Sequence, residues 1–387
     1  MTEKMLVVDD EPDLESLILQ RFRRKIRDGE YDFVFAQNGL EALARILEHK
    51  DIGLVLSDIN MPEMDGLTLL AKLNELKNPA MRTVIVSAYG DMDNIRTAMN
   101  RGAYDFVTKP VDFNDLEKTI EKTIAELKSI RTAVREHDRL MIIQYDLDTA
   151  RSIQFGILPK KFPPFPERNE FEIFASMQPA KEVGGDLYDF FLLDGDRVGF
   201  VIGDVSGKGV PAAIFMAVSR TLMRATALKG LEPDECLAYV NSLLFQESVS
   251  SMFVTMFYGI LNYKTGELAY ANGGHCLPYV LSKGCDLRAL ESTGMVLGLM
   301  EERKYGCNRL HLNPGDTCFT FTDGVTEAIN PGEEFYGEKR LEQLLRDKAA
   351  LDTTSLVKEC FADVHNFMNG AEQADDITVL SIKLNER

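Results

Sequence analysis

The sequence lacks three patterns that would place it in familiar classes of protein. It has no run of 18 apolar residues, and its first eight residues contain only the short stretch MLVV, so we expect neither a membrane span nor a secretory signal. The six cysteines are far apart and form no CxxC pair, which favours a reduced cytosol over a disulfide framework or a zinc site. Acidic residues outnumber basic ones, 61 to 43, with no basic patch. We therefore expect a soluble, cytoplasmic protein that binds neither nucleic acid nor a membrane surface.

Proline and glycine are also missing from one long stretch, residues 114–158, which has neither until Gly156. Apolar residues recur in it at helical spacings that drift toward heptads: Leu116, Ile120, Ile124, Leu127, Val134, Met141 and Tyr145. Asn114 is the expected N-cap, with Glu117 reaching back to it. A single helix of this length would measure roughly 65 Å. Since no small domain could cover it, the pattern predicts a helical linker between two domains.

The role of this linker has two interpretations. Arg131 and Asp138 occupy positions where a heptad needs apolar residues, so a coiled coil would be weak, and a homodimer through the linker is a candidate assembly only. The helix is either an inert spacer or a connector that carries a signal between acidic sites on either side of it.

The residues before the linker alternate short apolar runs with amphipathic segments. Strands are expected at 5–9, 32–37, 52–58, 82–88 and 104–110, and helices around 14–26, 40–47, 67–76 and 95–99. This rhythm predicts βαβ units and a parallel sheet, whose ligands gather at the carboxyl ends of the strands. The residues expected at those ends are Asp9, Asp10, Asp58, Ser87 and Lys109.

These residues suggest a phosphate-accepting site. Three converging carboxylates need a cation between them, and oxygen ligands suit Mg²⁺. Asp58 can act as the nucleophile of an aspartyl phosphate while Asp9 and Asp10 hold the metal. Lys109 then offers a positive charge to the phosphoryl oxygens and Ser87 a hydroxyl donor. A single Asp at a strand end is usually a turn former or a helix cap, but five such residues together overturn that interpretation.

The motifs VVDDEP, SDINMPEMDG, VSAYGD and FVTKP make residues 1–127 resemble the receiver domain of two-component response regulators. The resemblance implies a flavodoxin-like fold and phosphoryl transfer from a sensor histidine kinase to Asp58. It places Mg²⁺ on Asp10, Asp58 and the Asn60 carbonyl, with Asp9 acting through water. It also makes Ser87 and Phe106 a switch on the face formed by the fourth and fifth strands.

After the boundary at Pro159, residues 159–387 mix strands and helices in separate blocks. Strands are expected at 171–178, 197–205, 253–261, 267–273, 317–324 and 376–384, and helices at 210–227, 233–245, 339–346 and 355–368. The order predicts an α+β domain with two sheets between helices.

Four acidic motifs adjoin these strands: GGDLYDF, GDVSGKG, FTDGVTEA and ADDITV. Each Asp-Gly alone is more often a turn, but together, with no G-x-S-x-G nucleophile frame, they predict a site for Mg²⁺ or Mn²⁺. Paired ions could hold a hydroxide for in-line attack on phosphorus. GDVSGKG lacks the full P-loop frame, so we reject a nucleotide-binding P-loop.

Together with ARSIQFGILP, PAKEVGGD, ANGGHCLP, STGMVLGL and LNPGDTCFTFTDGVTEA, these motifs resemble the SpoIIE-like branch of the PPM-type protein Ser/Thr phosphatases. The resemblance implies hydrolysis of phosphoserine or phosphothreonine by two Mg²⁺ or Mn²⁺ ions. Their ligands would be Asp204 as the bridge, the Val205 carbonyl, Asp186, Asp323 and Asp375.

The same resemblance suggests further roles near the metals. Lys181 stands where the wider family has a basic residue for the substrate phosphate, and Gly185 stands where the eukaryotic branch has another acid. His275 is interpreted as structural rather than as a proton carrier. Asp189 and Asp376 are expected to support the metal ligands from behind.

The whole sequence therefore predicts a multidomain chain: an α/β flavodoxin-like receiver, a long helical linker (114–158) and an α+β PPM-type phosphatase sandwich. Phosphorylation of Asp58 would control the phosphatase, and the resemblance suggests a phosphorylated STAS-type anti-sigma factor antagonist as substrate. The alternative is a non-enzymatic adaptor that binds a sigma factor or its regulators, but an adaptor need not keep all four carboxylates. A DNA-binding regulator is set aside because no basic recognition helix is present.

Overall fold

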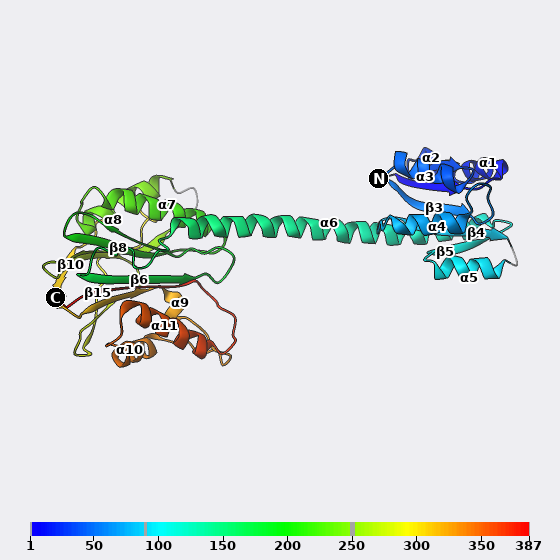
Figure 1. The fold of residues 1–387 in the computed structure, drawn as a ribbon. Helices are drawn as coiled ribbons and strands as arrows, with labels where there is room; N and C mark the ends of the chain where they lie inside the picture. Colours follow the sequence, from blue (N-terminus) through cyan, green and yellow to red (C-terminus); the bar gives the residue numbers. More distant parts are fainter. Residues whose placement is uncertain (1, 89–90, 248–251, 387) are drawn as a thin grey trace. The chain divides into compact units, whose positions relative to one another are not determined.

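The computed structural model describes residues 2–88, 91–247 and 252–386 of the chain (Figure 1). It divides into two compact units, Met1–Ile143 and Gln144–Arg387. The first contains the blue and cyan elements of Figure 1, and the second contains the green to red ones. Of the motif VSAYGD, Tyr89 and Gly90 lie outside the described residues.

The first unit is built on a five-stranded parallel sheet with the strand order β2-β1-β3-β4-β5. Its strands are β1 (Glu3–Val8), β2 (Tyr31–Ala36), β3 (Ile52–Asp58), β4 (Arg82–Ala88) and β5 (Asp105–Lys109). The central strand β3 is buried at every residue, which explains the apolar run IGLVL that precedes its last two residues. All five predicted strands are present, and the flavodoxin-like prediction is confirmed.

Helices cover both faces of this sheet. They are α1 (Pro12–Arg21), α2 (Arg23–Arg27), α3 (Gly39–Glu48), α4 (Gly66–Glu75) and α5 (Met92–Asn100), joined by the start of α6 (Phe113–Ile157). Met5 and Val7 of β1 pack in a cluster with α1 and α6, while Leu6 packs on the other face with α3 and α4. The helix predicted over 14–26 is divided in two at Phe22, whose ring is buried in the first of these clusters.

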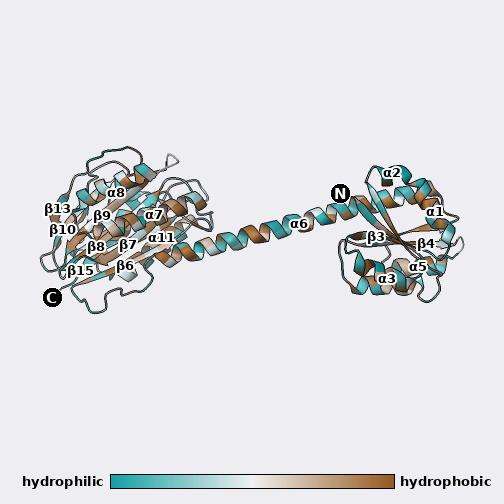
Figure 2. Ribbon diagram, turned by 90° about the horizontal axis from the view of Figure 1, so that it is seen from above, coloured by the Kyte–Doolittle hydropathy of each residue, from teal (hydrophilic) through white to brown (hydrophobic). Residues whose placement is uncertain are grey.

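The 45-residue helix α6 matches the predicted linker to within one residue at each end. Its first part belongs to the receiver core, where Leu116, Ile120, Ile124 and Leu127 are buried. Residues 132–146 are exposed, and hydrophobic and hydrophilic residues alternate along this middle stretch (Figure 2). Its last turn enters the core of the second unit, where Leu158 directly follows the helix and is buried.

The predicted N-cap of α6 is wrong by two residues. The Asp112 side chain accepts the Asn114 N–H at 2.8 Å, so Asp112 takes the capping role. The Asn114 and Glu117 side chains instead both accept hydrogen bonds from Arg21 of α1. Both polar groups are therefore used to join two helices of the receiver rather than to begin one.

The second unit contains two antiparallel five-stranded sheets. The first has the order β13-β10-β9-β8-β7 and the second β12-β11-β14-β15-β6. The strands are β6 (Phe171–Gln178), β7 (Leu187–Leu192), β8 (Arg197–Val205), β9 (Val254–Asn262), β10 (Glu267–Gly273), β11 (Tyr279–Leu281), β12 (Leu287–Ala289), β13 (Asn308–His311), β14 (Thr317–Phe321) and β15 (Ile377–Leu384).

The two sheets pack face to face, and helices cover their outer faces. Phe200 and Ile202 of β8 meet Ile382 of β15 in the cluster between the sheets. Helices α7 (Val210–Ala227) and α8 (Pro233–Glu247) pack on the first sheet. The second sheet is covered by α9 (Asp323–Thr326), α10 (Glu338–Asp347) and α11 (Thr353–Met368), whose buried residues share a cluster with its strands. The predicted sandwich of two sheets between helices is confirmed.

Four strands were not predicted: β7 and the short β11, β12 and β13. The last three have three or four residues each, too few to show a period-2 pattern. Strand β7 is almost entirely buried, and its sequence LYDFFL includes the buried Asp189. A charged residue within a buried strand interrupts the apolar run by which such a strand is recognised in the sequence.

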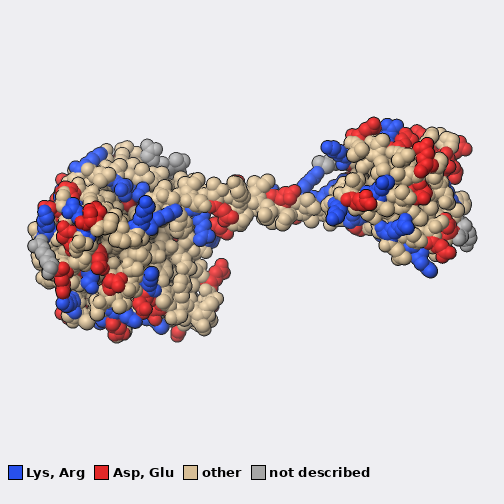
Figure 3. Space-filling view, viewed as in Figure 1, with Lys and Arg blue, Asp and Glu red and all other residues tan. Residues whose placement is uncertain are grey.

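Two further properties of the chain are the distribution of charge on its surface and the hydropathy of its helices. On the face drawn in Figure 3, basic and acidic residues are interspersed over each unit and no continuous basic surface is visible. Among the described residues, no helix combines the length and the apolar character needed to cross a membrane.

Candidate functional site

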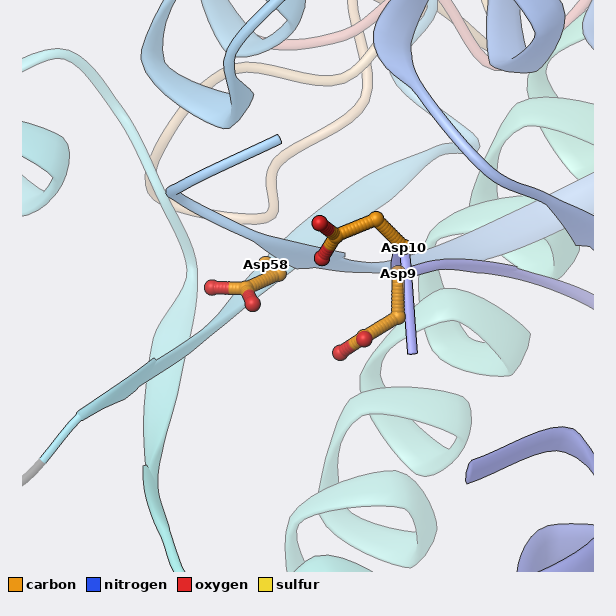
Figure 4. Close-up of side chains that lie close together, drawn as sticks. All are labelled: Asp9, Asp10 and Asp58. Atoms are coloured by element: carbon orange, nitrogen blue, oxygen red, sulfur yellow. The ribbon is translucent and has the colours of Figure 1, made fainter. Parts of the chain in front are cut away.

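The receiver carries three carboxylates at the carboxyl ends of two neighbouring strands. Asp9 and Asp10 directly follow β1, and Asp58 is the last residue of β3. Each offers an oxygen within 4.8 Å of the others, and the three side chains gather at one edge of the sheet (Figure 4). Asp9 and Asp58 are buried and Asp10 is exposed, so the cluster lies at the surface with its base in the core. The set fits the oxygen ligands that Mg²⁺ prefers.

Backbone donors hold Asp58 in place from one side. Its Oδ1 accepts the Ile59 N–H at 2.6 Å and the Asn60 N–H at 3.4 Å. Its Oδ2 lies 2.7 Å from Lys109 Nζ. The Oδ1 atom of Asp58 is thus held by backbone N–H groups, and its Oδ2 atom faces the ammonium group of Lys109.

Lys109, at the end of β5, contacts three carboxylates at once. Its Nζ lies 2.9 Å from both Asp9 Oδ2 and Glu11 Oε1, in addition to Asp58. Burial lowers the pKa of Lys109, but the hydrogen bonds to Asp58, Asp9 and Glu11 outweigh it and raise the pKa. The lysine therefore stays charged. Glu11, which the motif-based reasoning did not select, shares the lysine with the two aspartates.

Ser87 and Phe106 lie on the adjacent strands β4 and β5. Ser87 is buried, and its hydroxyl donates to Asp91 Oδ2 over 3.4 Å. Phe106 pairs in register with Ile85 and packs, half-buried, against the cluster that contains Ile59 and Leu70. The structure brings both residues to the predicted face of the sheet, and their switching role stays a prediction.

In the second unit, the predicted metal-binding aspartates come from four separate segments. Asp186 precedes β7, Asp204 lies near the end of β8, Asp323 begins α9, and Asp375 precedes β15. Asp186 is buried, and its Oδ2 accepts hydrogen bonds from Thr322 at 2.8 Å and from Thr378 at 2.5 Å. Thr322, which directly follows β14, and Thr378 of β15 therefore fix the orientation of this carboxylate.

These carboxylates act on one another electrostatically. Burial, and then the charges of Asp323 and Asp375, raise the pKa of Asp204 to about 7. Burial and the charge of Asp204 raise the pKa of Asp186 well above its ordinary value. Burial also raises the pKa of Asp323. Like charges held together away from water are stable only when protons or cations neutralise them, so this donor set fits divalent ions.

The spacing of this second group differs from that of the receiver. Across the part of the chain that the structure describes, Asp9, Asp10 and Asp58 form the only group of three or more such residues whose ligand atoms lie mutually within 4.8 Å. Among the four aspartates of the second unit, no three meet this criterion, although Asp186 and Asp204 are close enough to share a hydrogen bond.

The Val205 carbonyl, predicted as a further ligand, lies against Gly185. A Cβ at position 185 would be 2.8 Å from the Val205 oxygen and 3.5 Å from Asp204 Oδ1. Glycine at position 185 is therefore required by the close approach of this carbonyl, and the extra acid of the eukaryotic branch would not fit in this conformation.

Asp376 accepts hydrogen bonds from the backbone that precedes and carries Asp186. Its Oδ1 accepts the Ala180 N–H at 2.8 Å, and its Oδ2 accepts the Gly185 N–H at 2.6 Å. The Asp186 N–H points at the same Oδ2 from 3.5 Å. Asp376 thus holds the loop that carries Asp186 rather than facing the metal space itself.

Asp189 does not have the predicted supporting role. It is fully buried and forms ion pairs with Arg220 and Arg224 of α7, with oxygen–nitrogen distances of 2.8 Å to each. Asp189 stands three residues after Asp186, within β7, and its contacts are with the helix that covers the sheet. It ties β7 to α7 instead of supporting a metal ligand.

A lysine other than the predicted one contacts the carboxylates. Lys208 Nζ lies 2.9 Å from Asp375 Oδ2, and its pKa is raised first by that hydrogen bond and also by the charges of Asp376 and Asp323. Lys181 is exposed, and among the described residues no contact joins it to the four aspartates. Lys208 is the lysine of the motif GDVSGKG. The sequence analysis considered this motif only as a P-loop and therefore did not select its lysine.

His275 is linked to the backbone of Asp204 through Thr255. Its Nδ1 is 2.9 Å from Thr255 Oγ1, and that hydroxyl donates to the Asp204 carbonyl at 3.3 Å. Burial lowers the pKa of His275 to about 4, so the ring is neutral at physiological pH. These contacts favour the predicted structural role.

Comparisons with known proteins match each unit to a known family. A family model described as "Response regulator receiver domain" matches residues 5–121, and one described as "Stage II sporulation protein E (SpoIIE)" matches residues 194–385. The chain is 30% identical over 256 residues to "Phosphoserine phosphatase RsbU" of Bacillus subtilis, covering 65% of this chain and 75% of RsbU. It is 30% identical over 285 residues to "Protein IcfG" of Synechocystis sp., covering 66% of this chain but 44% of IcfG.

A solved structure shares the fold of the second unit. The "SiaA-PP2C domain of Pseudomonas aeruginosa" has a TM-score of 0.58 and 23% sequence identity, covering 64% of this chain and 99% of that chain. The fold and sites therefore define a response-regulator receiver linked to a PP2C-type domain. The chain belongs to the SpoIIE and RsbU family of PPM-type protein serine/threonine phosphatases.

Proposed function

We propose that this chain is a phosphatase controlled by phosphorylation of its own receiver. Asp58 accepts a phosphoryl group from a sensor histidine kinase, and the second unit hydrolyses phosphoserine or phosphothreonine in a partner protein. The observation that carries the proposal is the set Asp186, Asp204, Asp323 and Asp375, which four segments distant in sequence bring within electrostatic reach of one another. A merely structural domain gains nothing from such mutual repulsion.

In the receiver, the contacts of Asp58 and Lys109 support the proposed aspartyl phosphate. The backbone holds Asp58 Oδ1, while Oδ2 is directed toward the charged Lys109. Asp10, Asp58 and the Asn60 carbonyl would hold Mg²⁺, with Asp9 acting through water, and the ion would supply charge neutralisation for the incoming phosphoryl group. Lys109 stabilises the added negative charge, and the hydroxyl of Ser87 can donate to a phosphoryl oxygen.

In the phosphatase unit, Asp186, Asp204, Asp323, Asp375 and the Val205 carbonyl would hold two Mg²⁺ or Mn²⁺ ions. Ions bound there would activate a water molecule for in-line attack on phosphorus. Thr322 and Thr378 orient Asp186, and Asp376 fixes the loop that carries it. Lys208 lies beside Asp375 and can contact the phosphate of the substrate, a role that the sequence pattern assigned to Lys181.

The partners follow from the same family membership. RsbU is named a phosphoserine phosphatase, and we propose as substrate a phosphorylated STAS-type anti-sigma factor antagonist. The six cysteines are free, which supports a reducing, cytoplasmic location. The exposed Met141 and Tyr145 on α6 support a homodimer through this helix, which sedimentation of the full chain would test.

The first experiment measures Mn²⁺-dependent hydrolysis of a phosphoserine peptide by the full chain. Asp204→Ala and Asp323→Ala should abolish turnover, while Asp194→Ala, which removes an exposed surface ion pair with Arg197, should not. Circular dichroism would verify that each variant is folded. Retained turnover in the first two variants would disprove the two-metal assignment, and an inactive wild-type chain would favour the adaptor alternative.

The second experiment addresses the receiver. Acetyl phosphate should label the wild-type chain and the Asp93→Asn variant, whose substitution lies in the exposed first turn of α5, but not Asp58→Asn. Labelling of Asp58→Asn would contradict the assignment of the phosphoacceptor. Turnover compared with and without the label would then give the direction of control.

A further inference from the structure

Two surface segments beside Asp323 each expose one large apolar side chain. The first joins β10 to β11 and carries Leu277, which is 41% exposed. The second follows α9 and carries Phe335, which is 62% exposed. Single exposed hydrophobic residues are common on protein surfaces, so exposure alone assigns no role to either side chain. What distinguishes these two is how their segments are fixed next to the proposed metal ligands.

The turn that carries Leu277 is held in place by a buried asparagine. The Asn272 side chain accepts the His275 N–H at 2.8 Å and donates to the His275 carbonyl at 3.1 Å. Cys276 follows directly, and burial and then the charge of Asp323 raise the pKa of its thiol. Leu277 is therefore the exposed neighbour of a residue that lies within electrostatic reach of a proposed metal ligand.

The second segment forms an ordered hairpin that directly continues α9. The Gly337 N–H donates to the carbonyl of Thr326, the last residue of α9, at 2.9 Å. Phe335 is paired with Ile329 across the hairpin. At the tip, the Asn330 side chain accepts two backbone N–H groups of the turn. Phe335 is thus presented on a fixed backbone, so covering it costs little conformational entropy.

The two segments are anchored in the same part of the core. Tyr336, the neighbour of Phe335, is buried in the cluster on the outer face of the second sheet, and Cys276, the neighbour of Leu277, packs against that cluster. In extended backbone, successive side chains point to opposite faces. Leu277 and Phe335 therefore project outward from two segments whose inner residues share one cluster, and we call these two side chains the apolar rim.

The occupant that suits the apolar rim is the phosphoprotein substrate, because the rim is continuous with the proposed catalytic site. Asp323 adjoins both segments: after burial, the charge of Glu327 at the start of the hairpin is the largest cause that raises its pKa. An extended peptide advances about 3.3 Å per residue, so residues two to four positions from a bound phosphoserine reach roughly 7–13 Å from it. The hairpin, residues 326–337, contains three glutamates and neither lysine nor arginine, which favours basic over acidic residues in that peptide.

We infer that Leu277 and Phe335 form a substrate-docking surface that binds an apolar side chain flanking the phosphorylated residue, with basic rather than acidic residues beside it. The inference rests on the proposed function and names a specificity-determining surface of the same site. In that function Lys208 contacts the phosphate from beside Asp375, so the apolar rim adds recognition of the polypeptide itself. Covering an apolar side chain of this size should strengthen binding about 10-fold.

The test compares phosphopeptides with a phosphoester too small to reach the apolar rim. The full chain at saturating Mn²⁺ is given para-nitrophenyl phosphate, and separately short phosphoserine peptides of Gly and Ser in which one Leu is moved through the flanking positions. The variants are Leu277→Ser, Phe335→Ser and the two combined. Leu228→Ser is the matched control, because Leu228 is 54% exposed and lies at the end of the 18-residue helix α7 farther from Lys208, roughly 27 Å along the helix.

In the wild type, kcat/KM should be about 10-fold higher with Leu at the best flanking position than with Ser there, and the combined variant should reduce this preference to about twofold or less. Leu228→Ser should keep the full preference. Every variant should hydrolyse para-nitrophenyl phosphate as the wild type does, which also verifies that the site is folded. A peptide with Arg beside the favoured Leu should be hydrolysed faster than one with Glu there, and Glu333→Gln should narrow that difference.

Three results would overturn the inference. Equal or absent turnover of all the peptides by a wild type that hydrolyses para-nitrophenyl phosphate would do so while leaving the phosphatase assignment intact, and so would a leucine preference that survives in the combined variant. A wild-type dimer that becomes a monomer in Phe335→Ser, seen by sedimentation, would show that a second copy of the chain covers the apolar rim. A wild type that hydrolyses neither kind of compound would overturn the phosphatase assignment and the inference together.

Discussion

Arg131 Nη1 of helix α6 lies 2.9 Å from Glu3 Oε2 of strand β1, and the carboxylate of Glu3 is almost completely buried. The guanidinium fills the space beside Gly53, where a Cβ would lie 2.1 Å from its Nη2. Arg131 is therefore part of the receiver core and binds the linker helix to the first strand of the sheet.

Arg131→Met should destabilise the receiver, because it removes the nearer partner of the buried Glu3 carboxylate and leaves it only Lys128, whose Nζ is 3.9 Å from Glu3 Oε1. We expect a loss of about 2 kcal/mol in the free energy of unfolding, below the range for fully buried pairs because Arg131 is partly exposed. Urea denaturation of the full chain, followed by a receiver signal, measures it. Arg139→Met, at an exposed position of the same helix, is the control, and equal stability of the two variants would contradict the pairing.

The ion pairs of Asp189 give a second prediction. Asp189→Ala leaves Arg220 and Arg224 next to each other with no anion between them, and should cost about 3 kcal/mol in the stability of the phosphatase unit. Mn²⁺ affinity of the folded protein should stay within twofold of the parent, because Asp189 faces α7 and not the metal ligands. A large loss of Mn²⁺ affinity with unchanged stability would restore the supporting role first expected for Asp189.

A third prediction concerns pH. Burial, Asp323 and Asp375 raise the pKa of Asp204 to about 7, whereas an unfolded aspartate titrates at roughly pH 4. Between these values the folded metal-free chain retains a proton that the unfolded chain has lost, so the free energy of unfolding falls as pH rises from about 4 to about 7 and levels off above it.

Asp204→Asn removes this titration and should flatten that fall. Thermal unfolding in chelator from pH 5 to pH 8, with wild type and variant side by side, is the measurement. Part of the slope will remain because the pKa of Asp186 and of Asp323 is raised in the same direction. Identical profiles for the two chains would mean that Asp204 is not protonated in the folded metal-free state.

A fourth prediction separates the two lysines. Lys208→Met should raise KM for a phosphoserine peptide about 10-fold, since a charge-assisted contact to phosphate would be lost. Lys181→Met, an exposed position, should leave KM unchanged. Steady-state kinetics at saturating Mn²⁺ decides between them, and the opposite pattern would return the phosphate contact to Lys181.

Much of this molecule could be predicted because its features are local in the sequence. The run IGLVLSD is apolar up to Ser57 and ends in an aspartate, and a strand followed by a turn places Asp58 at the carboxyl end of the sheet without further information. Asp186, Asp204 and Asp323 likewise adjoin glycines and strand ends. The convergence of these residues then follows from the topology of the sheets.

The remaining features depend on contacts between distant segments. Asp and Asn are equally common at helix N-caps, so residue type does not distinguish Asp112 from Asn114. In the structure Asp112 is the cap, and the Asn114 side chain instead accepts a hydrogen bond from Arg21, about 90 residues away. Asp186 and Asp189 share one short motif, and only the packing of α7 distinguishes Asp186, the proposed metal ligand, from Asp189, which pairs with two arginines. The spacing of Arg220 and Arg224, one helical turn apart on α7, was the available sign of a buried acid facing that helix.

The exposed middle of α6 has a practical consequence for dissecting the protein. A protease that cuts after Arg139 meets a stretch whose side chains are exposed from residue 132 to residue 146. The two fragments would each keep the part of α6 that their own core requires: Leu116 to Arg131 with the receiver, and Gln154 to Leu158 with the phosphatase. A fragment that begins instead at Pro159 would lose Gln154 and both of its hydrogen bonds to Gly184, so the boundary chosen for an isolated catalytic fragment decides whether the backbone at Gly184 keeps its partners.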